Sequence, residues 1–127
     1  MRYWIQDEDA TPQGFPLAKL IRIIIQQLGN IGYELWIRRS QGYGLAINEW
    51  DGRLDHEDKL LISPKALQDV SEGVEEWFYD LDAEIITNNM RVRFGLHDST
   101  AMYIEAPEEF AEDIIRLFSS VKAEIEE

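Results

Sequence analysis

Seven carboxylates between positions 69 and 84 have the most evident capacity for chemistry in this sequence, because no lysine or arginine lies among them. If the segment is helical, positions 69, 72, 76 and 80 share one side, since residues three or four apart face the same way. Such a cluster indicates either a docking face for a basic partner or a solvated face that keeps the protein soluble. The candidate partner-binding residues are these carboxylates and one tyrosine of the same segment: Asp69, Glu72, Glu75, Glu76, Tyr79, Asp80, Asp82 and Glu84.

The total charge of the chain favours the same kind of partner. The 127 residues include 25 acidic and 12 basic ones, which gives a net charge of −13. Residues 61–127 hold 16 of the acidic and 5 of the basic residues. A surplus of this size repels nucleic acids and anionic membranes and attracts basic proteins. We therefore expect a basic protein partner, such as a toxin or effector, and no nucleic-acid or membrane partner.

Groups for acid–base or nucleophilic catalysis are scarce. The chain has no cysteine, which excludes disulfides and thiolate chemistry. Its only histidines are His56 and His97, and His97 is followed directly by Asp98 and Ser99. Consecutive residues of a tight turn point in different directions, so these three cannot align as a catalytic triad. We predict no catalytic residue, and an enzyme that uses carboxylates or a metal is the third alternative.

A second acidic segment contains Asp51, Asp55, His56, Glu57 and Asp58. These residues could gather around a divalent cation, but their spacing does not match a calcium-binding loop, which needs acidic residues at alternating positions and a glycine at the sixth. An exposed loop between two strands accounts for the same residues. We therefore predict no metal site and no cofactor.

Three aromatic residues fall outside the predicted apolar faces. Trp36 and Tyr103 are out of phase with the apolar side of their predicted strands, and Tyr79 lies on the polar side of its predicted helix. A helix that covers the second face of the sheet would bury the first two. If they are exposed instead, they are aromatic anchors beside an acidic rim, a combination that is common at protein interfaces.

Three segments have the pattern of helices. Phe15–Leu28 has a proline in its first turn, apolar residues at helical spacing and a glycine directly after it. Ser63–Ile85 begins with a serine cap and a proline, and is either one helix or two short helices that meet near Ser71. Pro107–Ile125 carries an apolar stripe that predicts the last helix.

Alternating apolar residues between turn signals predict the strands. The predicted strands are Arg2–Gln6, Lys59–Ile62 and two hairpins, Tyr33–Ile37 with Gly44–Trp50 and Val92–Leu96 with Ala101–Glu105. The order β-α-β-β-(β)-α-β-β-α predicts an α+β fold, a two-layer domain in which three helices cover an antiparallel or mixed sheet of about five to six strands. The length and the 45% apolar content predict one acidic domain over residues 1–127.

Two functional interpretations follow. In the first, the chain is an acidic inhibitor of the immunity-protein type, which neutralises a basic, nucleic-acid-cleaving toxin by covering its active surface. In the second, the predicted order from Phe15 onward, α-β-β-β-α-β-β-α, together with a pI of about 4.4 and an amphipathic last helix, resembles the small dimeric chaperones of bacterial secretion systems. That resemblance implies a homodimer that holds an extended segment of its cargo.

The expected location is the cytoplasm. The first residues lack the pattern of a secretory signal, and the longest apolar stretch, Leu17–Leu28, is interrupted by Lys19 and Arg22 and is too short to span a bilayer.

Overall fold

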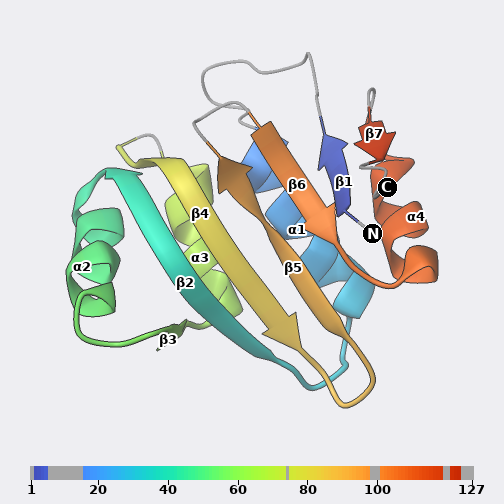
Figure 1. The fold of residues 1–127 in the computed structure, drawn as a ribbon, viewed down its shortest axis with the longest axis horizontal. Coiled ribbons are helices and arrows are strands. Elements are labelled where there is room, and N and C mark those ends of the chain that lie inside the picture. Colours follow the sequence, from blue (N-terminus) through green and yellow to red (C-terminus); the bar gives the residue numbers. More distant parts are fainter. Residues whose placement is uncertain (1, 6–15, 74, 98–100, 119–120, 124–127) are drawn as a thin grey trace.

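One antiparallel sheet extends through the whole protein (Figure 1). The computed structural model describes residues 2–5, 16–73, 75–97, 101–118 and 121–123. The strand order is β3-β2-β4-β5-β6-β1-β7, and all neighbouring pairs are antiparallel. The α+β class is confirmed, with seven strands in the described part where five or six were expected. The strands are β1 (Arg2–Ile5), β2 (Glu34–Tyr43), β3 (Leu60–Leu61), β4 (Trp77–Ile86), β5 (Arg91–His97), β6 (Ala101–Glu105) and β7 (Val121–Ala123).

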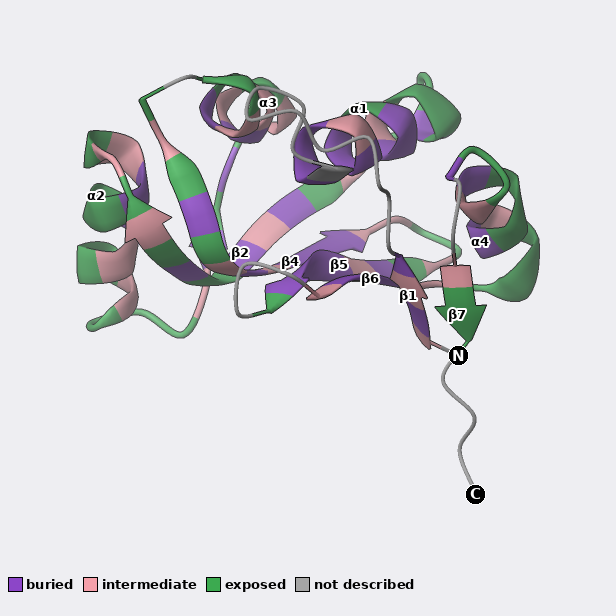
Figure 2. Cartoon of the chain, turned by 90° about the horizontal axis from the view of Figure 1, so that it is seen from above, coloured by how far each residue is buried: buried purple, intermediate pink, exposed green. Residues whose placement is uncertain are grey.

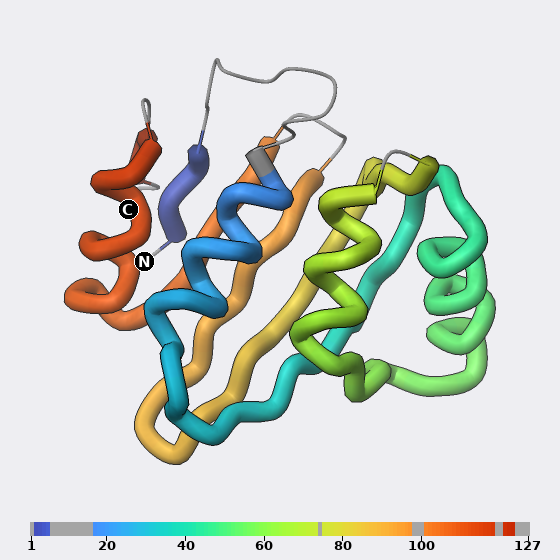
Figure 3. The backbone as a smooth tube through the Cα atoms, turned by 180° about the vertical axis from the view of Figure 1, so that it is seen from behind, coloured from blue at the N-terminus to red at the C-terminus, as the bar shows by residue number. Residues whose placement is uncertain are grey.

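Three helices cover one face of the sheet, and the described residues place none on the other (Figures 2 and 3). They are α1 (Pro16–Leu28), α3 (Pro64–Glu72) and α4 (Glu108–Ile115). A fourth helix, α2 (Leu45–Leu54), packs beside β2 at one end of the sheet. The core lies between the two layers, where buried helix residues such as Leu20 and Ile24 join the same cluster as Ile37 and Phe94 of the strands. Within the described residues, no helix has the length and apolar character needed to cross a bilayer.

Several elements lie where the sequence predicts them. β1 and α1 match their predicted segments to within a residue, and β3 lies inside the predicted third strand. Gly29, at φ 56°, follows α1 in the left-handed conformation that suits a helix end. The Ser63 side chain caps α3 by accepting a hydrogen bond of 3.1 Å from the Ala66 N–H. β5 and β6 form the second predicted hairpin.

The predicted strand Gly44–Trp50 is wrong, because these residues lead into helix α2. β2 continues beyond the predicted strand Tyr33–Ile37 to Tyr43, and Gly44, at φ 133°, separates β2 from the helix. Alternation at positions 45 and 47 favoured a strand, yet Leu45 is 90% exposed. The positions that α2 turns towards the core are 47, 50 and 54, a spacing of three and four residues that suits a helix.

The predicted helical region Ser63–Ile85 is a helix followed by a strand. α3 ends at Glu72, and Gly73 then adopts an extended conformation. The chain enters β4 at position 77, and positions 81, 83 and 85 of this strand are all buried. Positions 81 and 85 are four residues apart, which fits a helix and a strand equally. The buried Ala83 between them fits only the strand.

The last predicted helix is also shorter than expected. α4 ends at Ile115, and Leu117, an apolar residue inside the predicted helix Pro107–Ile125, is half exposed. Val121 begins β7 and pairs with Ile5 of β1. The predicted end of the helix at Ile125 lies outside the described residues. Pairing with β7 satisfies backbone groups of β1 that an edge strand would leave open.

The carboxylate of Glu76, the residue directly before β4, binds the first turn of α2. The Glu76 Oε1 accepts hydrogen bonds from the Ala46 and Ile47 N–H groups at 2.6 Å and 3.0 Å. These are two of the backbone donors that a helix leaves without partners in its first turn. Because Gly44 at the helix cap has no side chain to do this, a residue 30 positions away supplies the cap. The negative charge also lies at the positive end of the helix dipole.

We predict that Glu76→Ala lowers the free energy of unfolding by about 1–2 kcal/mol, because two N–H groups lose a charged acceptor. The matched control is Glu75→Ala, which removes the adjacent, exposed carboxylate and should change stability by less than about 0.5 kcal/mol. Urea unfolding of both variants measures the difference. Equal losses in the two variants would contradict the cap.

Candidate functional site

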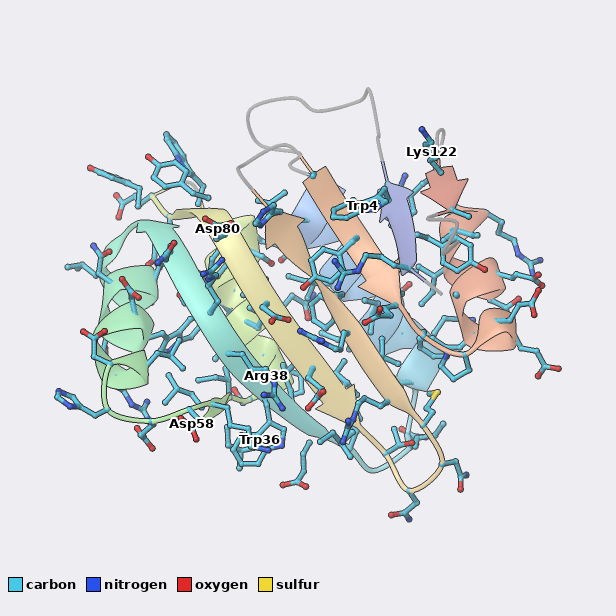
Figure 4. All side chains as sticks on the ribbon, viewed as in Figure 1. Trp4, Trp36, Arg38, Asp58, Asp80 and Lys122 are labelled. Carbon is cyan, nitrogen blue, oxygen red and sulfur yellow. The ribbon has the colours of Figure 1, made fainter. Side chains whose placement is uncertain are left out.

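The uncovered face of the sheet is polar and carries most of the basic residues. It faces the reader in Figure 1, with α1 and α3 behind it, and Figure 4 shows Trp4, Arg38 and Asp80 in front of the strands. On this face and its rim, seven basic residues outnumber five acidic ones in the described part of the chain, so the face is weakly positive although the net charge is −13. They are Arg2, Arg38, Arg39, Lys59, Arg91, Arg93 and Lys122, against Glu34, Asp80, Asp82, Glu84 and Glu105.

One row of residues, which we call the central row, crosses six strands of this face. Residues that are directly opposite each other on neighbouring strands point to the same side of the sheet, so the row brings together groups that are far apart in the sequence. The register places its members side by side in the order Arg39, Asp82, Gly95, Tyr103, Trp4 and Lys122.

Asp82 is the hub of the central row, because donors from two other strands meet on its carboxylate. The Arg93 Nη2 donates to Oδ2 at 2.8 Å, and the Tyr103 hydroxyl donates to Oδ1 at 3.0 Å. Gly95 makes room for this contact: a β-carbon there would lie 1.9 Å from the Leu81 carbonyl oxygen and 3.1 Å from the Tyr103 hydroxyl. The missing side chain therefore lets Tyr103 reach across β5 to β4.

The Asp82 hub keeps both donors protonated. Burial raises the pKa of Tyr103 above its ordinary value, and the charge of Asp82 and the hydrogen bond to it raise the pKa further. Burial lowers the pKa of Arg93, but the Asp82 carboxylate more than offsets this effect, and the net shift is upward. Tyr103 is therefore a neutral donor and Arg93 a cation over the whole physiological range.

A buried carboxylate lies in the row next to the central row. Glu84 is only 2% exposed. The Arg38 Nη2 donates to its Oε1 at 3.2 Å, and the Arg91 Nε lies 3.5 Å from its Oε2. The two guanidinium groups offset the cost of removing this carboxylate from water. The row reads Trp36, Glu84, Arg93, Glu105 and Arg2, so its charges alternate in sign.

A hollow of about 390 Å³ lies above the central row. Arg39 lines it from β2, and Trp4 lines it from β1. His97 and Asp80 line it as a pair, with 3.2 Å between the imidazole Nδ1 and the carboxylate Oδ1. Arg39 makes no ion pair within the described residues, and its side chain is exposed. The hollow therefore combines an aromatic ring, a paired carboxylate and a guanidinium group that is available to a ligand.

A second surface lies where β2 and β4 meet α2. Four large side chains, which we call the corner patch, are exposed there: Tyr43 (61%), Leu45 (90%), Trp77 (48%) and Tyr79 (45%). The ring centres of Tyr43 and Trp77 are 5.7 Å apart across the two strands. Glu75 and Glu76 line a broad hollow of about 630 Å³ beside Tyr43 and Leu45. Exposed aromatic residues beside carboxylates are typical of protein interfaces.

The predicted carboxylates do not form one face. The alignment of positions 69, 72, 76 and 80 on a single helix is wrong, because α3 ends at position 72. Only Asp69 and Glu75 lack a charged or hydrogen-bonded contact among the described residues. The other five bind groups of the protein itself: Glu72 with Gln68 and Arg22, Glu76 with the start of α2, Asp80 with His97, Asp82 with Arg93 and Tyr103, and Glu84 with Arg38 and Arg91.

Sequence reasoning did not propose Arg39, Arg93, Tyr43 or Leu45 as residues of a functional site. The positions of Trp36 and Tyr103, out of phase with the apolar residues of their strands, did indicate this face, because both side chains point away from the helices. Trp36 is half-buried, with the Lys59 Nζ 4.3 Å from its ring centre, and Tyr103 is buried under Arg2, whose guanidinium lies 4.4 Å from its ring centre. Side chains of this face bury them, and no second layer of described helices is needed.

The segment around Asp51 and His56 forms the end of α2 and the chain after it. Within the described residues, no group of three or more histidine, aspartate or glutamate side chains is arranged to hold a metal ion. Asp98 and Ser99, beside His97, lie outside the described residues. Comparisons of the chain with protein-family models, curated proteins and solved structures gave no match.

We predict that the free energy of unfolding falls as the pH rises above 10, the ordinary pKa of tyrosine. In the Tyr103→Phe variant, the free energy of unfolding should fall less steeply with pH. In the unfolded chain Tyr103 loses its proton first, because its folded-state pKa is raised. Its contribution is therefore complete below that pH and is lost as the pH rises towards the folded-state pKa. The expected difference in slope is at most about 1.4 kcal/mol per pH unit.

Urea unfolding between neutral pH and pH values above 10 measures this difference. Tyr79→Phe, which changes an exposed tyrosine, is the control and should follow the parent protein. The assignment fails if Tyr103→Phe has the same pH dependence as the parent. At neutral pH, Tyr103→Phe should cost about 1 kcal/mol for the lost hydrogen bond to Asp82.

Proposed function

We propose that this protein is a non-enzymatic binding module whose corner patch docks on a basic protein. The observation that supports the proposal best is the exposure of four large side chains in one place, Tyr43, Leu45, Trp77 and Tyr79. Tryptophan and tyrosine are the residues that most often dominate binding energy, because they bury a large area at a small cost in conformational entropy.

The charge of the protein supports a basic partner. A net charge of −13 accelerates the approach of a cationic surface, and the acceleration weakens as salt screens it. Near the corner patch, Glu75 is the exposed carboxylate without a contact inside the described part of the protein. The Oε1 of Glu76 already accepts two hydrogen bonds from the first turn of α2. Glu76 therefore adds negative charge beside the corner patch, but its two oxygens are not both available to a partner. The docking residues are therefore the corner patch with Glu75, rather than a helical face of carboxylates.

Inhibition by occlusion is the role that such a surface suits. A basic partner that binds nucleic acid presents cationic groups for phosphates, and carboxylates can occupy those groups while the aromatic residues anchor the complex. We therefore propose an inhibitor of the immunity type, directed against a basic and nucleic-acid-cleaving toxin. The alternative of a secretion chaperone loses the element order on which its resemblance was based, because the described order from α1 onward is α-β-α-β-α-β-β-β-α-β.

We predict that Trp77→Ala weakens the complex with the basic partner about 30-fold or more, which corresponds to about 2 kcal/mol for the loss of a central anchor. The matched control is Leu117→Ala, which removes an equally exposed apolar side chain elsewhere and should change affinity less than twofold. Glu75→Lys should slow association and reduce the salt dependence, while Trp77→Ala should mainly accelerate dissociation.

The partner is identified by affinity capture from the host and mass spectrometry, and is then purified for kinetic measurements at low and high salt. A captured protein with an acidic surface, or an affinity that does not change with salt, would overturn the proposal. So would equal binding by Trp77→Ala and Leu117→Ala. Urea unfolding of each variant establishes that the changes act on binding and not on folding.

A further inference from the structure

The hollow above the central row carries a cationic group that the fold leaves unused. Five of the seven basic residues on the uncovered face contact a carboxylate or an aromatic ring: Arg38 and Arg91 contact Glu84, Arg93 contacts Asp82, Arg2 contacts Glu105 and two rings, and Lys59 contacts Trp36. Arg39 lines the hollow and makes no such contact among the described residues.

We propose that this hollow binds a small molecule that carries a phosphate or carboxylate group on a planar ring. A guanidinium group suits such an oxyanion because its N–H groups form a fork that matches two oxygens. Arg39 is the residue that binds the oxyanion, and Trp4, on the opposite side of the hollow, is the residue that contacts the ring. A volume of about 390 Å³ fits a ligand of this size.

The charges in the hollow favour an anion. Asp82 is engaged by Arg93 and by the Tyr103 hydroxyl, and Asp80 is engaged by His97. Arg2 and Arg39 add two further positive charges to the lining. Apart from His97, the lining holds three guanidinium groups and two carboxylates, which sum to a net positive charge. The negative charge of the rest of the protein is largely screened beyond about 8 Å at physiological salt.

The floor of the hollow is preorganised. The Asp82 hub fixes Arg93 and Tyr103, and Arg2 lies 5.5 Å from the centre of the Trp4 ring and 4.4 Å from that of Tyr103. A ligand therefore binds without first ordering these side chains, which lowers the entropic cost of binding. This site differs in both place and sign of charge from the corner patch, so it does not depend on the proposed function.

The test uses phenyl phosphate, benzoate and inorganic phosphate as probes, with the full chain labelled with ¹⁵N for NMR titration. Phenyl phosphate and benzoate should bind saturably at millimolar concentration or below, with shifts at Trp4, Arg39 and Tyr103. Inorganic phosphate, which has no ring, should bind more weakly. Arg39→Gln should weaken phenyl phosphate binding about tenfold or more, the usual cost of losing a charge-assisted hydrogen bond.

Two further variants separate a specific site from a general effect of charge. Arg53→Gln removes the same charge from α2, where Arg53 pairs with Glu57 at 3.8 Å, and should change binding less than twofold. Asp80→Asn removes a carboxylate from the lining and should tighten binding, a gain that loss of folding cannot produce. Equal effects of Arg39→Gln and Arg53→Gln, weaker binding by Asp80→Asn, or no saturable binding of any probe would overturn the proposal.

Discussion

The rest of the structure depends on one constraint, which is that the helices of the described residues cover only one face of the sheet. Every second residue of five central strands must therefore find its partners on the open side. Charged and aromatic residues do this by covering one another: two arginines bury the Glu84 carboxylate, and Arg2 lies over the Tyr103 ring. The open face is consequently a network of opposite charges in fixed register, and its weak positive charge contrasts with the acidic remainder of the protein.

Sequence patterns identified the fold where one periodicity was clear and failed where two periodicities fitted. α1 and the β5–β6 hairpin have long, consistent patterns and clear end signals. The apolar residues at positions 81 and 85 of β4 fit the spacing of a helix and of a strand equally well. Only the burial of Ala83 between them, which the structure shows, distinguishes the strand from the helix. In α2, the apolar residues Leu45 and Ile47 are two positions apart, which favoured a strand. The buried residues are Ile47 and Trp50, and their spacing of three positions is that of a helix.

The candidate site was predictable in its acidic half only. Asp80, Asp82 and Glu84 stood out because the sequence places no base near them. Their partners come from other strands: Arg38 lies 46 positions before Glu84, and Tyr103 lies 21 positions after Asp82. A single sequence contains no register between distant strands, so it could not show that these carboxylates are already paired. For the same reason, it could not separate Glu75, which is exposed, from Glu76, which caps α2.

The contact of Glu76, which directly precedes β4, with the first turn of α2 also has a thermodynamic consequence. One carboxylate borders the corner patch and at the same time holds the first turn of α2, so an event at either place alters the other. A molecule that gripped Leu45 tightly would suppress opening of this helix, and slower amide exchange along α2 would report its presence. By the same reciprocity, a protein in which α2 opens more readily would hold that molecule less firmly.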